Sequence, residues 1–268
     1  MHIVVLAKAV PNTAEGERLT GELRIDRSAT DPIINPNDEH ALEAALRLAD
    51  ADPTTRTTML TMGPETAWAG LSKALAAGIG RSVVVSDPAL ENSCILSTAR
   101  VLAAALAREP FDLVLGGQDT TDGRGGVVVA TVATLLGLPF IRHASDVRVY
   151  GGELVARLER DDGTDMIAVP LPALVTVTHA VGELRYPSLR SIMATRSRRP
   201  EILTLDDLGL DPAAVGRAAA TTRVVRATAA EVPQEARVIA GEPPEVMARA
   251  VADFLAERGF LPDPGLGA

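Results

Sequence analysis

The sequence predicts an α/β fold: an open, mainly parallel, Rossmann-like sheet with helices on both faces, an added antiparallel hairpin and a C-terminal arm. Up to residue 136, short β-branched runs alternate with longer stretches of helical period, which is typical of a parallel sheet covered on both sides. After residue 138, alternation around Tyr150–Gly151–Gly152 and Asp161–Asp162–Gly163 indicates hairpin strands. From about residue 200 the chain is rich in Ala, Thr and Pro, with weak periodicity.

The spacing of apolar residues predicts the individual elements. We expect strands at residues 2–7, 56–62, 81–86 and 111–116, and a further buried strand at Val175–Thr178. Crossover helices are expected where apolar residues share a helical face: Leu42, Ala45, Leu46 and Ala49; Leu71, Ala74 and Leu75; and Ile95, Ala99, Leu102 and Leu106. A fourth helix is expected over residues 124–136 with Gly137 as its stop, and a final amphipathic helix carries Met247, Ala250, Val251 and Phe254 before Gly259.

Composition argues against several classes of function. The chain has 268 residues and a formal charge of −9, from 26 Lys and Arg against 35 Asp and Glu, which disfavours general binding to nucleic acid. Its single cysteine, Cys94, rules out an intrachain disulfide, and no spacing of Cys and His suggests a structural zinc. Apolar runs reach neither the length of a signal peptide nor the roughly 18 residues of a membrane span, so we expect a cytoplasmic protein without direct membrane insertion.

Two regions are expected along the chain. Residues 1–200 form the α/β domain, and residues 201–268 form a C-terminal extension. A segment of about forty residues with so little core-forming pattern is improbable as a free loop in a compact domain. We expect it to lie along another subunit. A disordered tail is the alternative, because low hydrophobic density also marks disorder.

The segment Gly182–Met193 carries unusual residue choices for a loop. It places Leu189 and Ile192 among arginines, and Pro187 fixes the backbone and biases Tyr186 toward an extended conformation. A basic run of Arg196, Arg198 and Arg199 follows directly. Residues 182–199 therefore read as a docking surface for a protein partner. The alternative is that Leu189 folds back onto its own domain.

Two further segments suggest a ligand site at the carboxyl edge of the sheet, where open α/β sheets bind ligands. Asn35–Pro36–Asn37–Asp38 is a strong helix start, which structure alone would also explain. Gly116–Gly117–Gln118 ends a strand, and Asp122–Val127 is a glycine-rich lead into a helix, so backbone N–H groups can face an anion. The alternative is a glycine-rich turn that holds nothing. Neither a GxGxxG nor a Walker pattern occurs.

Together with Asn35–Pro36 and Met62–Gly63–Pro64, the segment Gly182–Met193 makes the chain resemble the small (beta) subunit of the electron transfer flavoproteins, from residue 1 to about residue 210 and weakly beyond. The resemblance implies that Asn35 contacts an adenine nucleotide, AMP or a second FAD. It implies flanking contacts from Leu6, Ala7, Met62 and Gly63, and a phosphate site formed by Gly116, Gln118, Asp122, Arg124, Gly125, Gly126 and Val127. The chain departs from the family at 125–127, where side-chain hydrogen bonds are lost, backbone donors remain and Arg124 offers compensating charge.

The resemblance also implies partners. The redox-active FAD would be held mainly by the alpha (large) subunit, and electrons would pass from a primary flavin dehydrogenase to a quinone reductase or another acceptor. Glu159 would pair with an arginine of the mobile flavin domain, and Leu189 would anchor in the dehydrogenase, with Tyr186, Ile192 and Met193 beside it. Such a chain is an electron carrier subunit rather than a catalyst with its own active site. A stand-alone adenine-nucleotide module, a sensor or hydrolase, is the alternative.

Overall fold

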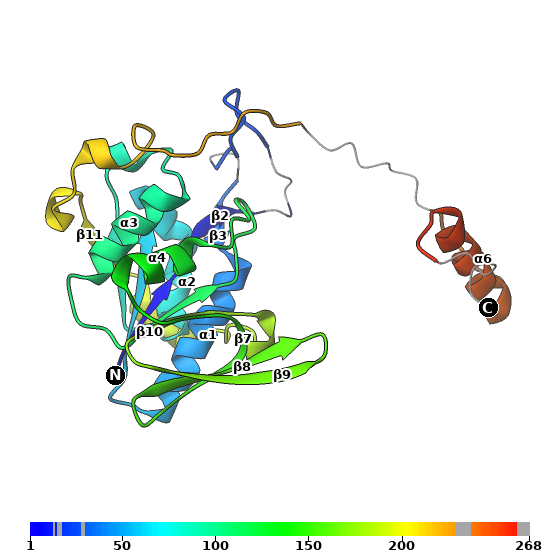
Figure 1. The fold of residues 1–268 in the computed structure, drawn as a ribbon, viewed down its shortest axis with the longest axis horizontal. Coiled ribbons are helices and arrows are strands. Elements are labelled where there is room, and N and C mark those ends of the chain that lie inside the picture. The colour runs from blue at the N-terminus through cyan, green and yellow to red at the C-terminus, as the bar shows by residue number, and fades with distance from the viewer. Residues whose placement is uncertain (13, 15–17, 28–29, 229–236, 262–268) are drawn as a thin grey trace. The chain divides into compact units, whose positions relative to one another are not determined.

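The central feature of the computed structural model, which describes residues 1–12, 14, 18–27, 30–228 and 237–261, is a nine-stranded sheet (Figure 1). The strand order is β11-β5-β4-β1-β6-β10-β7-β8-β9. The pairs from β11 to β7 are parallel, and the β7-β8 and β8-β9 pairs are antiparallel. The bounds are β1 (His2–Leu6), β4 (Arg56–Met62), β5 (Arg81–Val85), β6 (Leu113–Gly117), β7 (Phe140–Tyr150), β8 (Glu153–Arg160), β9 (Gly163–Pro170), β10 (Ala173–Val177) and β11 (Glu201–Leu203).

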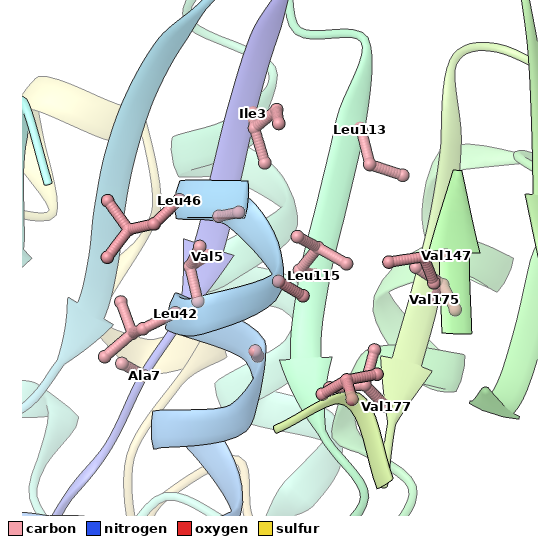
Figure 2. Packing of buried hydrophobic residues seen from close by; sticks show 14 of the residues in the cluster. Ile3, Val5, Ala7, Leu42, Leu46, Leu113, Leu115, Val147, Val175 and Val177 are labelled. Carbon is pink, nitrogen blue, oxygen red and sulfur yellow. The ribbon is translucent and has the colours of Figure 1, made fainter. Parts of the chain in front are cut away.

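Helices cover both faces of the sheet, as the sequence predicts. One hydrophobic cluster joins α1 (Pro36–Ala51) and α2 (Trp68–Ala77) to one face, and a second joins α3 (Ile95–Leu106) and α4 (Val128–Leu136) to the other. Figure 2 shows Leu42 and Leu46 of α1 beside Val5 of β1 and Leu115 of β6. The alternation of inward residues along β1 explains both clusters, because Val5 lies on one face of the sheet and Val4 on the other.

The fourth helix begins later than the sequence predicts. The expected start at residue 124 is wrong, because Arg124 has φ +45° and Gly126 has φ +62°, left-handed values that an α-helix does not tolerate. Residues 124–127 are instead an irregular loop, and α4 begins at Val128. The helix ends as predicted at Gly137, which is left-handed with φ +67°.

The antiparallel hairpins are confirmed. Strands β7 and β8 are joined through Gly151 and Gly152, and β8 and β9 through Asp161 and Asp162. The smaller elements are a two-stranded pair, β2 (Ala9–Pro11) with β3 (Pro32–Ile34), the short helix α5 (Leu189–Thr195), and the 3-10 turns η2 (Glu65–Ala67), η3 (Pro88–Leu90), η4 (His179–Val181), η5 (Asp206–Leu208) and η6 (Pro212–Ala214).

The first compact unit continues past residue 200. It spans Met1–Arg226, because β11 joins the sheet beside β5 and because Leu205 and Val215 are buried in the core. These few well-placed residues had no periodic signal. The second unit is Ala227–Ala268, and its helix α6 (Pro244–Glu257) matches the predicted amphipathic helix, with Gly259 beyond it at φ +72°. Within the described ranges, no helix is long and apolar enough to cross a membrane.

Candidate functional site

The strand order reverses next to β1. Chain connections run from β1 outward to β4 and β5 on one side, and the chain then returns to place β6 on the other side. The crevice outside the carboxyl ends of such diverging strands is where open α/β sheets bind ligands. Here the parallel pairing of β1 and β6 ends with Leu6 opposite Gly116. The candidate site therefore lies just beyond these two residues.

A buried carboxylate bridges the two strand ends. The backbone N–H of Lys8, after β1, donates to Oδ2 of Asp38 at 2.9 Å, and the N–H of Gly117, in β6, donates to Oδ1 at 3.1 Å. Burial raises the pKa of Asp38 to about 7, although the Lys8 and Gly117 N–H groups and the Asn35 side chain oppose the shift by hydrogen bonding. Gly117 permits the close approach, because a Cβ there would lie 2.6 Å from Oδ1 of Asp38. The sequence suggested Asp38 only as an acidic residue in the first turn of a helix.

Asn35 holds the loop that follows β6. It is the N-cap residue of α1, as predicted, but its side chain makes no capping bond. Its Nδ2 instead donates to the carbonyl of Asp119 at 2.8 Å, and its Oδ1 accepts from the N–H of Thr121 at 3.1 Å. Asn37 also donates to the carboxylate of Asp119. Because Asn35 is fully buried and its amide is engaged at both ends, it fixes the course of residues 119–121.

Asp122 lies between two cations that the sequence did not single out. Its carboxylate contacts Nζ of Lys8 at 2.8 Å and Nη2 of Arg27 at 2.7 Å, while its own side chain is 1% exposed. Burial alone would raise the pKa of Asp122, but Lys8 and Arg27 hold it well below its usual range. The only available signal for Lys8 was its position directly after the first strand. Asp122 thus serves as the fixed centre of an ion-paired cluster at the sheet edge.

The glycine-rich loop presents backbone donors to solvent. Gly125, Gly126 and Val127 are exposed, and within the described part of the chain their N–H groups have no hydrogen-bond partner. The N–H of Arg124 is not available, because it donates to the carbonyl of Thr120 at 2.9 Å. In the same loop, the buried hydroxyl Oγ1 of Thr121 has no hydrogen-bond partner among the residues that the structure describes. Unsatisfied donors of both kinds suit an anionic, oxygen-rich ligand.

The other residues predicted to flank an adenine gather at the same edge. Leu6 and Ala7 are buried, whereas Met62 and Gly63 after β4 are half-buried. Leu6 pairs with Leu60 of β4, and the N–H of Ala7 donates to the Leu60 carbonyl at 3.1 Å, so the two strand ends adjoin. Gly116 is buried under α4, and a Cβ at this position would lie 2.7 Å from Val129. Gln118, the first residue after β6, is half-buried.

The apolar residues predicted to dock a partner within residues 182–199 are exposed, except Leu184, which is buried. Tyr186 is 95% exposed and Leu189 is 82% exposed, and Ile192 and Met193 are also on the surface. Leu189 therefore does not fold back onto its own domain. Helix α5 begins after Ser188, whose Oγ accepts from the N–H of Ser191 at 3.1 Å. Glu159 is exposed on β8, opposite Thr164 of β9.

Two surface cavities lie at the opposite, amino-terminal edge of the sheet. The larger, of about 540 Å³, is lined by residues that include Arg56, Arg81 and Arg185. Arg81 is already paired with Glu109 and Glu201, and Arg185 with Glu43. The guanidinium groups of Arg81 and Arg185 are therefore engaged, whereas the free backbone donors lie at the carboxyl edge of the sheet. We place the site at the carboxyl edge. No group of His, Cys, Asp and Glu suited to a metal ion occurs among the described residues.

Comparison with known proteins fits this arrangement. The family model described as electron transfer flavoprotein domain matches residues 22–208. The chain belongs to the electron transfer flavoprotein family. It is similar to the electron transfer flavoprotein subunit beta of Mycobacterium leprae, with 36% identity over 85% of this chain and 88% of the relative. The corresponding subunit of Megasphaera elsdenii is 34% identical over 84% and 86%.

A third relative extends the similarity along the whole chain. The caffeyl-CoA reductase-Etf complex subunit CarD of Acetobacterium woodii is 31% identical over 97% of this chain and 100% of its own length. The chain is therefore a small (beta) subunit of an electron transfer flavoprotein, a component of electron transport. This membership does not favour the alternative of a stand-alone adenine-nucleotide module. The expected resemblance is confirmed.

Proposed function

We propose that this beta subunit pairs with an alpha subunit that holds FAD, binds an adenine nucleotide itself, and docks the dehydrogenase that supplies electrons. The observation that carries the proposal is the meeting of loop 117–127 with the ends of β1 and β4 at one sheet edge, where free backbone donors lie. The electrons pass on to a quinone reductase or another acceptor. FAD, when bound by the alpha subunit, supplies the redox chemistry, and this chain supplies position and contacts.

The residues at the carboxyl edge fit the phosphate of AMP or of a second FAD. The N–H groups of Gly125, Gly126 and Val127 are exposed and free among the described residues, as oxyanion binding requires. Arg124 adds positive charge, although its Nε also donates to the Thr121 carbonyl at 3.3 Å. Asp122 does not repel the phosphate strongly, because Lys8 and Arg27 balance its charge.

The adenine would lie between the ends of β1 and β4. Four residues offer apolar surface there: Leu6, Ala7, Met62 and Gly63. The end of β6 at Gly116, with Gln118 after it, closes the other side. The amide of Asn35 is not free to bind the ligand. Asn35 instead supports this site by its hydrogen bonds to Asp119 and Thr121.

The exposed apolar group of Tyr186, Leu189, Ile192 and Met193 forms the dehydrogenase-docking surface. A few buried apolar anchors carry most of the binding free energy in small interfaces, which suits a transient electron-transfer complex. Glu159 is proposed to pair with an arginine on the flavin domain of the alpha subunit. The CarD relative is named as part of a complex with a reductase, which supports an oxidoreductase as the docking partner.

The C-terminal extension is proposed to contact the alpha subunit. No described side chain of α6 is buried, yet the helix carries Met247, Ala250 and Phe254 along one stripe. An amphipathic helix needs a surface that covers its apolar stripe, and a long subunit interface provides one. A cytoplasmic location remains a prediction.

The test is to co-express the chain with the alpha subunit encoded beside it and to identify the released ligands by mass spectrometry. We expect a yellow heterodimer that releases FAD and an adenine nucleotide, whereas the chain alone is colourless. Gly126→Pro should abolish nucleotide retention, because proline removes one N–H and cannot adopt φ +62°. Gly126→Ala, which keeps the N–H but shares the strain, is the control and should retain more nucleotide. A wild-type heterodimer that releases no adenine nucleotide beyond its single FAD would contradict the proposed site.

A further inference from the structure

Where β1 and β6 separate, the side chain of Asp38 accepts the backbone hydrogen bonds that the two strands no longer make with each other. The strands pair up to Leu6 and Gly116, and beyond that pair the N–H groups of Lys8 and Gly117 both turn to the carboxylate of Asp38. One bond comes from the residue that follows the end of β1 by two positions and the other from the last residue of β6, and the acceptor comes from α1. Asp38 therefore ties together the two strand ends between which the crevice opens.

We infer that Asp38 is a positioning residue for the nucleotide: its ionised carboxylate fixes the separation of the two strand ends and, through Gly117, the course of loop 117–127. The inference rests on the proposed function, because the ligand is the adenine nucleotide proposed there. Asp38 is buried and its side chain is turned to backbone groups, so it acts through the loop and does not touch the nucleotide.

Only the ionised form fits both donors. A carboxylate accepts at each oxygen, whereas protonation turns one oxygen into an O–H donor that faces an N–H. The neutral form therefore keeps one strong bond and weakens the other. Since burial raises the pKa of Asp38 to about 7, both forms are populated near neutral pH.

The ionised form of Asp38 is stabilised mainly by uncharged hydrogen-bond donors, because the nearby cations are paired with other carboxylates. The ammonium of Lys8 is the nearest cation that favours ionisation, but its hydrogen bond goes to Asp122, which Arg27 also contacts. Asp119 is held by Asn37, and Glu39, the next residue along α1, pairs with Lys73 at 2.7 Å. Among the described residues, no cationic side chain is recorded in hydrogen-bond contact with Asp38.

The position of loop 117–127 depends on the bond between Gly117 and Asp38. Gly117 carries one bond to Asp38, and two and four residues later Asp119 and Thr121 are bound by Asn35. At the far end, the Gly126 backbone lies against Gln118, where a Cβ would be 3.5 Å from the Gln118 carbonyl. A displaced Gly117 would therefore move the donors of residues 125–127 away from the phosphate.

The experiment is a titration of the flavin-loaded heterodimer, stripped of its adenine nucleotide, with AMP between about pH 8 and about pH 6, on either side of the expected titration. The variants are Asp38→Asn and, as a matched control, Glu39→Gln, which removes one negative charge from the same first turn of α1. The phosphate of AMP has a second pKa of about 6, so its own titration falls below that of Asp38 and is the pH dependence that should remain in Asp38→Asn.

We expect wild-type and Glu39→Gln proteins to lose affinity for AMP in parallel with acidification, beyond the loss due to the phosphate itself. Asp38→Asn should bind roughly tenfold more weakly at the higher pH, because its amide accepts at only one atom, and it should lack the extra pH dependence. Because the wild-type profile needs no substitution, the inference can be tested even where Asp38→Asn folds poorly, which circular dichroism would reveal.

The outcomes separate this inference from the proposed function. AMP binding that neither acidification nor Asp38→Asn weakens would overturn the role of Asp38 and leave the nucleotide site in place. A parallel loss in Glu39→Gln at the higher pH would assign the effect to helix charge and would also overturn it. No AMP binding at any pH would overturn the nucleotide site, and the inference with it.

Discussion

The guanidinium of Arg185 grips the carboxylate of Glu43 with two hydrogen bonds, 3.0 Å from Nε and 2.9 Å from Nη2, and the backbone N–H of Arg185 adds a third at 3.0 Å. Arg185 is the residue before Tyr186, the first of the four exposed apolar residues proposed for docking, and Glu43 lies in the middle of α1. The hydrogen bonds raise the pKa of Arg185 further, so the cation persists at all accessible pH values. This pair fastens one end of the docking surface to the rigid core.

Glu43→Gln should loosen that end. The amide keeps one acceptor oxygen and loses the paired geometry, so we expect unfolding to become easier by about 1–2 kcal/mol and the dehydrogenase to bind more weakly. Hydrogen exchange over residues 183–195 and urea unfolding measure the two effects. Asp50→Asn is the control: Asp50 also contacts Arg185, at 2.8 Å, but it is largely exposed, so its loss should matter less. Equal effects from both variants would refute the special role of Glu43.

Leu189→Ala should weaken docking without affecting the fold. The side chain is 82% exposed, so its removal costs the isolated chain little, but an anchor buried in a complex contributes on the order of 2 kcal/mol. We expect slower electron transfer from the dehydrogenase at limiting flavoprotein, with unchanged flavin content. Leu135→Ala, at another exposed leucine on α4, serves as the control. Unchanged transfer kinetics in Leu189→Ala would exclude this anchor.

Asp122→Asn should destabilise the carboxyl edge. The variant leaves Lys8 and Arg27 without their shared anion, and we expect a loss of about 2 kcal/mol, less than for a fully buried pair because both cations are partly exposed. The pKa of Asp122 is depressed in the folded state, so its contribution is present above the unfolded pKa and is lost as the pH falls through the folded one. Denaturant unfolding at neutral and at strongly acid pH should show the difference shrinking in acid. A difference independent of pH would point to packing instead.

Asp38 should have the opposite effect on stability. Its folded pKa, about 7, is raised by burial above the unfolded value, so its contribution is fully present below the unfolded pKa and is lost as the pH rises through 7. The stability of Asp38→Asn relative to wild type should therefore improve as the pH rises from acid to about 8. Unfolding curves of the two proteins across this range provide the measurement, and a constant difference would contradict the raised pKa. Alkalinity thus weakens the fold slightly while it favours the nucleotide-competent loop.

Truncation after Arg226 should preserve the first unit and remove subunit association. That unit ends at Arg226 and contains both hydrophobic clusters, whereas α6 lies in the second unit. We expect the shortened chain to retain its circular dichroism and lose stable binding to the alpha subunit. Hydrogen exchange on the full chain is the companion measurement: α6 should be protected in the heterodimer and not in the isolated chain. Equal protection in both states would show that α6 does not depend on the partner.

The sequence predicts the layers well because they depend on local periodicity. Runs such as Leu42, Leu46 and the strand at residues 2–7 bury one face at a regular spacing, and the structure places them accordingly. The start of α4 was placed too early because the expected helix ran through Gly125 and Gly126, which have poor helix propensity, and the backbone there is left-handed at Arg124 and Gly126. Residues 203–215 gave no signal, because isolated leucines in an irregular segment reach the core only through long-range packing.

The candidate site was only partly visible in the sequence. Strand ends are predictable, so the meeting of Leu6, Met62 and Gly116 at one edge followed from topology alone. The clamp of Asp38 on Lys8 and Gly117, and the pairing of Arg27 with Asp122, join residues that are distant along the chain. Periodicity along a single sequence places residues on the face of a helix or strand. It does not show which charged groups from distant segments come into contact.

The docking segment is held at both ends by the same rigid body. Before it, Leu184 is buried in the core and Arg185 is bound to α1; after it, β11 pairs with β5 at Glu201 opposite Val83. Its conformational entropy is therefore largely lost on folding and not on encounter with a partner. A preformed segment with little left to order avoids most of the ordering cost of association, so a small apolar contact of the proposed kind can suffice for a brief encounter with a partner.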